Sequence, residues 1–159
     1  MKKIIIIISL LLFYIYCYFI YPNHISILQS SLVDFDFNLL LNKQPLVIED
    51  RIKDIRIVLN SWFSPNIIQD IEFDTSRTWN RNFNKYLVCY AIDDTDIVLC
   101  SCGNTVINDI ANDTEPIINI KLKKTQCLII PYRWYYNIKN NVKLYGIHDY
   151  ITYILDKII

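Results

Sequence analysis

The chain has 159 residues, 53% of them hydrophobic, and its 16 basic side chains balance 16 acidic ones, so that the formal net charge is zero. This length suits one domain and a tail. Nucleic-acid binding needs an excess or a stripe of basic side chains, and the sequence has neither, so we expect no nucleic acid among its partners.

The chain begins with an apolar segment. Lys2 and Lys3 precede the uncharged run Ile4–Ile20, which as a helix would be about 26 Å long, close to the roughly 30 Å hydrocarbon core of a bilayer. A signal peptide has a similar start, but the bulky residues that follow offer no small-residue cleavage site. We therefore predict a transmembrane signal-anchor over residues 1–21. A secreted soluble protein, formed by signal cleavage, is the alternative.

Charge around this segment predicts its orientation. Lys2 and Lys3 lie on one side, and the next charged residues on the other side are Asp34 and Asp36. The positive-inside rule then places the N-terminus in the cytoplasm and the folded part on the opposite side of a single-pass membrane protein. In a lumen, Asn112 of the sequon Asn112-Asp113-Thr114 would be a glycosylation site.

Residues 22–42 are predicted to be a juxtamembrane spacer with a short amphipathic helix, because apolar residues such as Leu28, Leu32 and Leu39 recur at near-helical spacing. This helix either lies on the membrane surface or caps the domain. The domain itself is predicted to span residues 43–159.

The domain is predicted to start with a strand at Pro45–Ile48, followed by a helix over Ile52–Phe63. A further short helix or turn is predicted around Ile67–Phe73. Asp74–Asn84 is polar, contains Trp79 and two arginines, and is predicted to be a long loop; Arg77 and Trp79 are candidates for a ligand-facing role, with surface packing as the other interpretation.

Two apolar runs then predict strands at Lys85–Ile92 and Asp96–Cys100, joined as a hairpin by a polar turn. Asp93, Asp94 and Asp96 at this turn lack the spacing of a calcium loop, so a solvated turn is expected. A polar loop and a strand over Pro116–Leu122 follow.

The run from Leu122 to Ile138 is the most informative. Cys127–Ile130 is a continuous apolar strand, and Pro131 removes a backbone donor, so the strand should end or bend there. Trp134, Tyr136 and Ile138 then alternate with more polar residues, which predicts a second strand with one apolar face. Together the two strands are expected to form a β-hairpin.

The tail is predicted to end in an amphipathic helix whose apolar face includes Ile147, Tyr150, Ile151, Ile154, Leu155 and Ile158. His148-Asp149 resembles the N-terminal cap of such a helix, with a general-base pair as the other interpretation.

The cysteine spacing lacks the paired motifs of a zinc site. Cys89, Cys100 and Cys127 lie in or at the end of apolar strands, which favours buried thiols. A disulfide involving Cys100 or Cys102 is the alternative if the domain is lumenal.

The order of an apolar strand, Pro131, Trp134, an aromatic ring at Tyr136 and Ile138 resembles the second metal-binding strand of the JmjC-like cupins. The strand at Pro45–Ile48 resembles the first strand of the same domains. The resemblance covers about Pro45 to Ile138, and it implies a mainly β, antiparallel double-sheet jelly roll of the cupin type. The catalytic members are Fe(II)- and 2-oxoglutarate-dependent oxygenases, which hold their metal with two histidines and one carboxylate.

Two positions depart from that pattern. The Gly-Asp pair is replaced by Thr125-Gln126, and Tyr136 stands where the family has an iron-binding histidine. The chain has only His24 and His148, neither in the expected strands. We therefore expect a degenerate metal position at Tyr136, no cofactor, and a residual pocket with Trp134, Tyr136, Trp79 and Arg77 as its candidate residues. This pocket is suited to apolar or carbohydrate-like contacts, or is simply filled.

The leading hypothesis is a membrane-anchored, catalytically inactive cupin-like domain with a structural or interaction role, which binds a protein partner or itself. Frequent Ile, Asn, Lys and Tyr indicate an A/T-rich genome, such as that of a large DNA virus. The alternative is a divergent iron oxygenase that uses His148 with a carboxylate of Asp149, Asp94 or Asp96.

Overall fold

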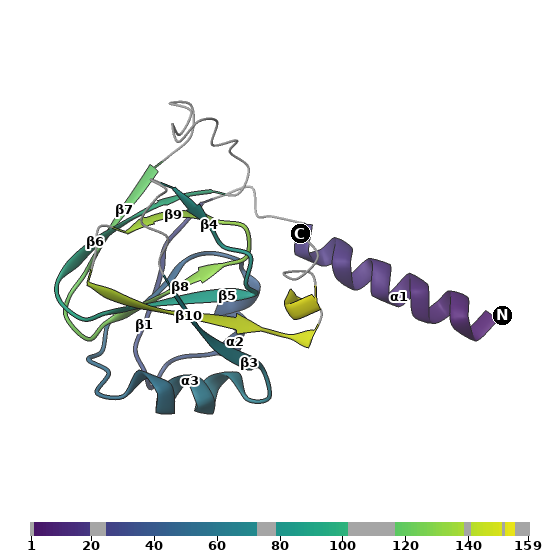
Figure 1. Ribbon diagram of the computed structural model, residues 1–159, viewed down its shortest axis with the longest axis horizontal. Helices are drawn as coiled ribbons and strands as arrows, with labels where there is room; N and C mark the ends of the chain where they lie inside the picture. The colour runs from purple at the N-terminus through teal and green to yellow at the C-terminus, as the bar shows by residue number, and fades with distance from the viewer. Residues whose placement is uncertain are drawn as a thin grey trace.

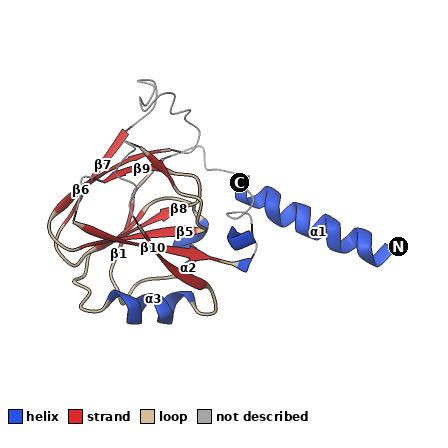
Figure 2. Cartoon of the chain, in the orientation of Figure 1, coloured by secondary structure: helices blue, strands red, loops and turns tan. Residues whose placement is uncertain are grey.

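The computed structural model describes residues 2–19, 25–72, 79–101, 117–138, 141–150 and 152–154 (Figure 1). These residues form a mainly β domain of two sheets, with helix α1 extending away from it (Figure 2). The mainly β, antiparallel double-sheet prediction is therefore confirmed.

The larger sheet has six strands in the order β1-β2-β8-β5-β10-β3. In that order they span Leu28–Ser30, Leu46–Ile48, Cys127–Pro131, Tyr86–Ala91, Val142–His148 and Ile67–Ile71. The smaller sheet has the order β4-β9-β6-β7, with bounds Asn80–Arg81, Tyr135–Ile138, Thr95–Cys100 and Ile117–Leu122. Among the strands of the described residues, only the pair β1–β2 is parallel.

The strands from β3 to β10 pair as one long, nested hairpin. β6 pairs with β7 at its tip, followed outward by β5 with β8, β4 with β9, and β3 with β10. This two-stranded ribbon wraps around itself, which brings β5 against β10 in one sheet and β6 against β9 in the other. Long-range pairing therefore closes the domain.

The two predicted hairpins are wrong in their pairing, although all four of their strands exist. β5 and β6 lie in different sheets, and so do β8 and β9. The turn after Pro131 instead carries the chain from the larger sheet to the smaller one, with Arg133 at φ 66°. Alternating hydrophobicity identifies the buried face of a strand but not the strand beside it.

The larger sheet is buried on both faces. Val47, Leu87 and Leu128 face the smaller sheet, where Leu99 and Trp134 meet them. The other face packs on α2 (Phe37–Leu41) and α3 (Ile55–Phe63), with residues of both helices joining Ile48, Val88, Cys127, Ile129 and Ile147. Burial on both faces explains why Cys127–Ile130 is apolar at every position.

The segment predicted as a spacer contributes two elements to the domain. β1 pairs in parallel with β2, and Leu40 of α2 is buried in the core. The side chain of Asp36 accepts a hydrogen bond from the backbone of Asn38 and caps α2. The two predicted positions for this amphipathic helix were the membrane surface and the cap of the domain, and α2 caps the domain.

Two other local predictions are wrong. Ile67–Ile71 is strand β3 rather than a helix or turn, and Ile147 belongs to strand β10 rather than to a terminal helix. Both short runs fit the two-residue period of a strand as well as the 3.6-residue period of a helix. The pairing of β10 with β3 and β5 makes both of them strands. The predicted cap is confirmed, because Asp149 Oδ1 accepts a hydrogen bond from Thr152 N at 2.8 Å, at the start of a short helical turn. Ile151, Leu155 and Ile158 lie outside the described residues.

Helix α1 covers Lys2–Phe19. Its apolar side chains at 5, 6, 8, 10–13 and 16 are between 46% and 64% exposed. Four of them are consecutive, so they point to all sides of the helix. Within the part of the chain that the structure describes, no helix has both the length and the hydropathy of a membrane span.

Gly146 lies within β10, the strand next to the edge strand β3 of the larger sheet, at the point where β10 passes Asn84. A Cβ atom at this position would lie 2.4 Å from Asn84 Oδ1 and 2.7 Å from Ile71 Cδ1. We predict that Gly146→Ala lowers the free energy of unfolding by about 1–3 kcal/mol, because the core must shift to accept the methyl group. Urea denaturation measures this. Asn84→Ala combined with Gly146→Ala should cost less than the sum of the single changes, and strict additivity would contradict the clash.

Candidate functional site

The predicted pocket is occupied by the protein's own side chains. Trp134 and Tyr136 point between the two sheets and are 2% and 7% exposed. They pack with Ile97, Leu99 and Leu128 in the same cluster. Trp79 is half-buried just before β4, and Arg77 lies outside the described residues. The structure thus brings Trp134 and Tyr136 together, as core residues.

The surroundings of Tyr136 do not fit the family's metal. In the smaller sheet, Tyr136 is paired with Asn80 of β4 on one side and with Leu99 of β6 on the other. Neither neighbour supplies an imidazole or a carboxylate, which are the donors of the facial triad. The described residues contain no group of three His, Cys, Asp or Glu side chains placed to share a metal ion.

His148 does not meet Asp94 or Asp96. It lies at one end of β10, whereas the two aspartates flank the turn beyond Ala91, which pairs with Val142 at the other end. Six residues of strand separate these ends, a distance of about 20 Å. The proposed ligand pairs of His148 with Asp94 or Asp96 are therefore wrong. His148 itself is 1% exposed, and its ring meets the Tyr153 ring edge-on at 5.8 Å.

The strand register defines an end of the domain where the chain arrives from α1. Leu28 pairs with Leu46, Tyr86 with both Pro131 and Ile147, and His148 with Ile67. We call this end the proximal end. Its described residues are 25–26, 43–45, 64–66, 81–86, 100–101, 131–135, 148–150 and 152–154. Figure 1 shows β10 ending on the side of the domain from which α1 leaves.

Buried polar side chains gather at the proximal end. Within the described residues, the buried polar side chains are those of Gln44, Asn82, Asn84, Ser101, His148 and Thr152. The central one is Asn82, which donates from Nδ2 to the carbonyl oxygens of Ile130 at 3.0 Å and Pro131 at 2.9 Å. Its Oδ1 accepts from both the backbone and the side chain of Asn84, each at 2.9 Å. Asn82 thus joins β8 to the segment before β5.

Further hydrogen bonds tie the other segments of the proximal end together. Gln44 Oε1 accepts from Ser26 N at 2.9 Å, and Trp134 Nε1 donates to the Lys43 carbonyl oxygen at 3.3 Å. Lys85 Nζ lies 3.2 Å from Asp149 Oδ2, which joins β5 to the terminal turn. Hydrogen bonds and an ion pair therefore join the segments of the proximal end. Asp149 both caps the terminal turn and pairs with Lys85.

The outer surface of the proximal end combines aromatic rings with cations. The Arg81 guanidinium lies over the rings of Phe83 and Tyr135, with 5.7 and 5.3 Å to their centroids. Its role is packing on aromatic rings, the interpretation that the sequence also offered for this loop. Tyr150 and Ile154 of the terminal turn are 72% and 57% exposed.

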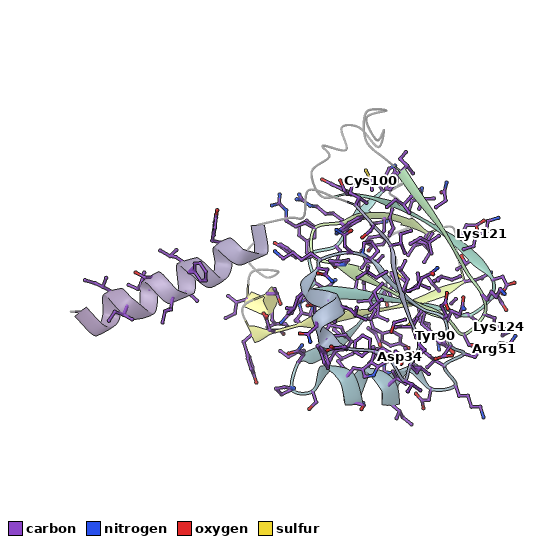
Figure 3. The ribbon with its side chains drawn as sticks, turned by 180° about the vertical axis from the view of Figure 1, so that it is seen from behind. Asp34, Arg51, Tyr90, Cys100, Lys121 and Lys124 are labelled. Atoms are coloured by element: carbon purple, nitrogen blue, oxygen red, sulfur yellow. The ribbon has the colours of Figure 1, made fainter. Side chains whose placement is uncertain are left out.

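The opposite, distal end is rich in charge of both signs. A surface hollow of about 480 Å³ is lined there by Asp94, Thr95, Asp96, Lys121, Leu122, Lys123 and Asn141. Beside it, Lys124 Nζ lies 3.0 Å from Asp93 Oδ1, and Lys124 N donates to Asp94 Oδ1. These acids form a solvated, ion-paired turn, as predicted. In Figure 3, Lys124 and Arg51 lie away from α1.

The predicted burial of three cysteines is confirmed, because Cys89, Cys100 and Cys127 are fully buried. Cys102 and the sequon residue Asn112 lie outside the described residues. Burial raises the pKa of Cys127 to about 12, and burial together with the nearby Cys127 raises that of Cys89 above the ordinary thiol value. Both are therefore protonated thiols at neutral pH.

These two thiols give stability a pH dependence. Above pH 9.0, the ordinary thiol pKa, the unfolded chain loses both protons while the native state keeps them until about pH 12. We predict that the free energy of unfolding falls over this window by about 1.4 kcal/mol per pH unit for each thiol. Cys127→Ala should reduce the slope in urea titrations at stepped pH, and an unchanged slope would contradict this origin.

No protein-family model matches the chain, and no curated protein shows significant similarity to it. Sequence reasoning missed the role of Asn82, Asn84 and Gly146. A signal was present: two asparagines alternate with Phe83 directly before an apolar strand, and side chains of this type satisfy the backbone where strands end.

Proposed function

We propose that the protein is a membrane-attached, non-catalytic β domain of the cupin-like type, which acts as a structural or interaction module. The observation that carries this proposal is α1. Its described apolar side chains are exposed on every side, and a helix that is hydrophobic all round requires an apolar environment beyond the domain. A lipid bilayer supplies such an environment.

Strand order supports the cupin-like fold. The nested pairs from β3–β10 to β6–β7 form an eight-stranded wrapped ribbon, the arrangement of a jelly roll. Among the segments that carry the family resemblance, Pro45 precedes β2, while Pro131 and Trp134 flank the crossing from β8 to β9. β1 and β2 extend the larger sheet beyond the ribbon.

The filled interior supports a non-catalytic role. Small-molecule sites are concave, with a few converging polar groups, but the space between these sheets holds Trp134, Tyr136 and aliphatic side chains. The paired neighbours of Tyr136 also lack the family's metal donors. We therefore assign the interaction to the outer surface of the domain, where a protein partner or a second copy of the chain would bind. Lys2 and Lys3 support a cytoplasmic N-terminus by the positive-inside rule, with the domain on the opposite side of the membrane.

Flotation of the full chain expressed with membranes tests the attachment. Wild-type protein should float with the membrane fraction and resist alkaline carbonate. Replacing Leu11 and Phe13 by arginine places two charges in α1, at roughly 2.5–3.5 kcal/mol each, and should release the protein. Val33→Arg with Ile57→Arg is the matched control, since these side chains are 92% and 67% exposed on the domain. If the variant with two arginines in α1 floats as well as the control variant, anchoring by α1 is refuted. If alkaline carbonate releases the wild-type protein from the membranes, its attachment is peripheral.

A further inference from the structure

The segment between α1 and the domain is short. α1 ends at Phe19, and Ile25 already packs against the core between the sheets. Five residues, 20–24, separate them. An extended chain of this length spans about 20 Å at most. If α1 is embedded, the proximal end must therefore lie within that distance of the bilayer surface.

The charges of the proximal end suit a lipid surface. The described residues of this end include the half-buried cations Lys43, Arg81, Lys85 and Arg133, whereas the carboxylate among them is that of Asp149, which is paired with Lys85. The distal end carries the acidic side chains Glu49, Asp50, Asp93, Asp94 and Asp96 together with the basic side chains Arg51, Lys121, Lys123 and Lys124. Among the described residues, the proximal end therefore has more basic than acidic side chains, whereas the charges of the distal end nearly balance.

The exposed apolar side chains of the proximal end are of the kinds found at a membrane–water interface. Tyr150 is 72% exposed, Ile154 57%, Phe83 38% and Tyr153 37%. Tyrosines with an apolar body and a polar tip, together with snorkelling Lys and Arg side chains, favour the headgroup region of a bilayer. The hydrogen bonds of Asn82, Gln44 and Asp149 hold these segments in place as one surface.

We propose that the proximal end docks on the anionic headgroup surface of the membrane that α1 enters, with Tyr150 and Ile154 inserted at the interface. This inference rests on the proposed membrane attachment and adds to it. The domain is then held flat against the bilayer, and the distal end, with its hollow of about 480 Å³, faces away from the membrane.

Fluorescence quenching in reconstituted vesicles tests the docking. Tyr150→Trp places a probe on the proximal end, and Val33→Trp places a matched, exposed probe at the distal end; the emission of the unmodified full chain is subtracted from both. Vesicles contain phosphatidylcholine brominated near the headgroup, with or without phosphatidylserine. We expect the Tyr150→Trp probe to lose on the order of half its emission in phosphatidylserine vesicles, and less without that lipid, while the Val33→Trp probe stays bright.

The outcomes separate the two proposals. Protein that does not float with the vesicles refutes the attachment by α1. Protein that floats but shows equal quenching of the two probes refutes the docking and leaves the attachment intact. A Tyr150→Trp probe that is shielded from aqueous iodide but not quenched by brominated lipid also overturns the docking, because a second copy of the chain then covers this end. Quenching without preference for phosphatidylserine overturns the role of the cations.

Discussion

Trp134→Ala is expected to lower the free energy of unfolding by about 3–5 kcal/mol, as full truncation of a buried large aromatic residue does. The indole is 2% exposed and packs between the two sheets. Its Nε1 also donates to the Lys43 carbonyl oxygen, which fastens the segment before β2. Trp134→Phe keeps most of the packing and loses this bond, so its cost should be clearly smaller. Chemical denaturation at neutral pH measures both.

Trp62→Ala is the matched control for this prediction. Trp62 is half-buried on α3 and stacks on Phe35 with 3.9 Å between ring centroids. Its truncation should cost less than that of Trp134, because solvent already reaches one side of it. Equal costs for the two, or a Trp134→Ala protein of unchanged stability, would mean that Trp134 faces an open pocket. The non-catalytic proposal would then lose its structural support.

The strands of this domain were largely predictable, and their partners were not. Pro131, Trp134 and Ile138 mark the end of β8 and the apolar face of β9, because a missing backbone donor and a period of two are local properties. Whether β8 pairs with β9 depends on how the whole ribbon wraps. The pairing of Tyr86 with Pro131 and of Tyr136 with Leu99 joins residues about 40 positions apart, beyond the reach of any local pattern.

Little of the candidate site was predictable from the sequence. The replacement of a metal-binding histidine by Tyr136 follows from the resemblance alone, and the structure adds that this side chain is core. The proximal end was not predictable, since Ser26, Gln44, Asn82 and Asp149 come from four distant segments. Each is an ordinary loop residue in the sequence, and the register from β1 through β2, β8 and β5 to β10 brings their segments to the same end.

Asn82→Ala is expected to lower the free energy of unfolding by about 3 kcal/mol, although it removes only a small polar side chain. The change leaves the buried carbonyl oxygens of Ile130 and Pro131 without the amide that now binds them, and it removes the acceptor of Asn84. Each buried group left unsatisfied costs about 1–3 kcal/mol. Asn119→Ala, on the exposed side of β7, is the control and should be nearly neutral.

Substitutions at Asn82 also distinguish the contribution of its hydrogen bonds from that of its side-chain volume. Asn82→Asp has nearly the same volume and still accepts from Asn84, but an ionised carboxylate cannot donate to the two carbonyl oxygens and would lie close to them. It should therefore destabilise at least as much as alanine at neutral pH, and part of the loss should be recovered in acid, where the protonated group donates once. Calorimetry of the three proteins at pH 7 and at low pH measures this order. Full stability of Asn82→Asp at neutral pH would show that the proximal end is held by packing alone, without the amide bonds from which its rigidity is inferred.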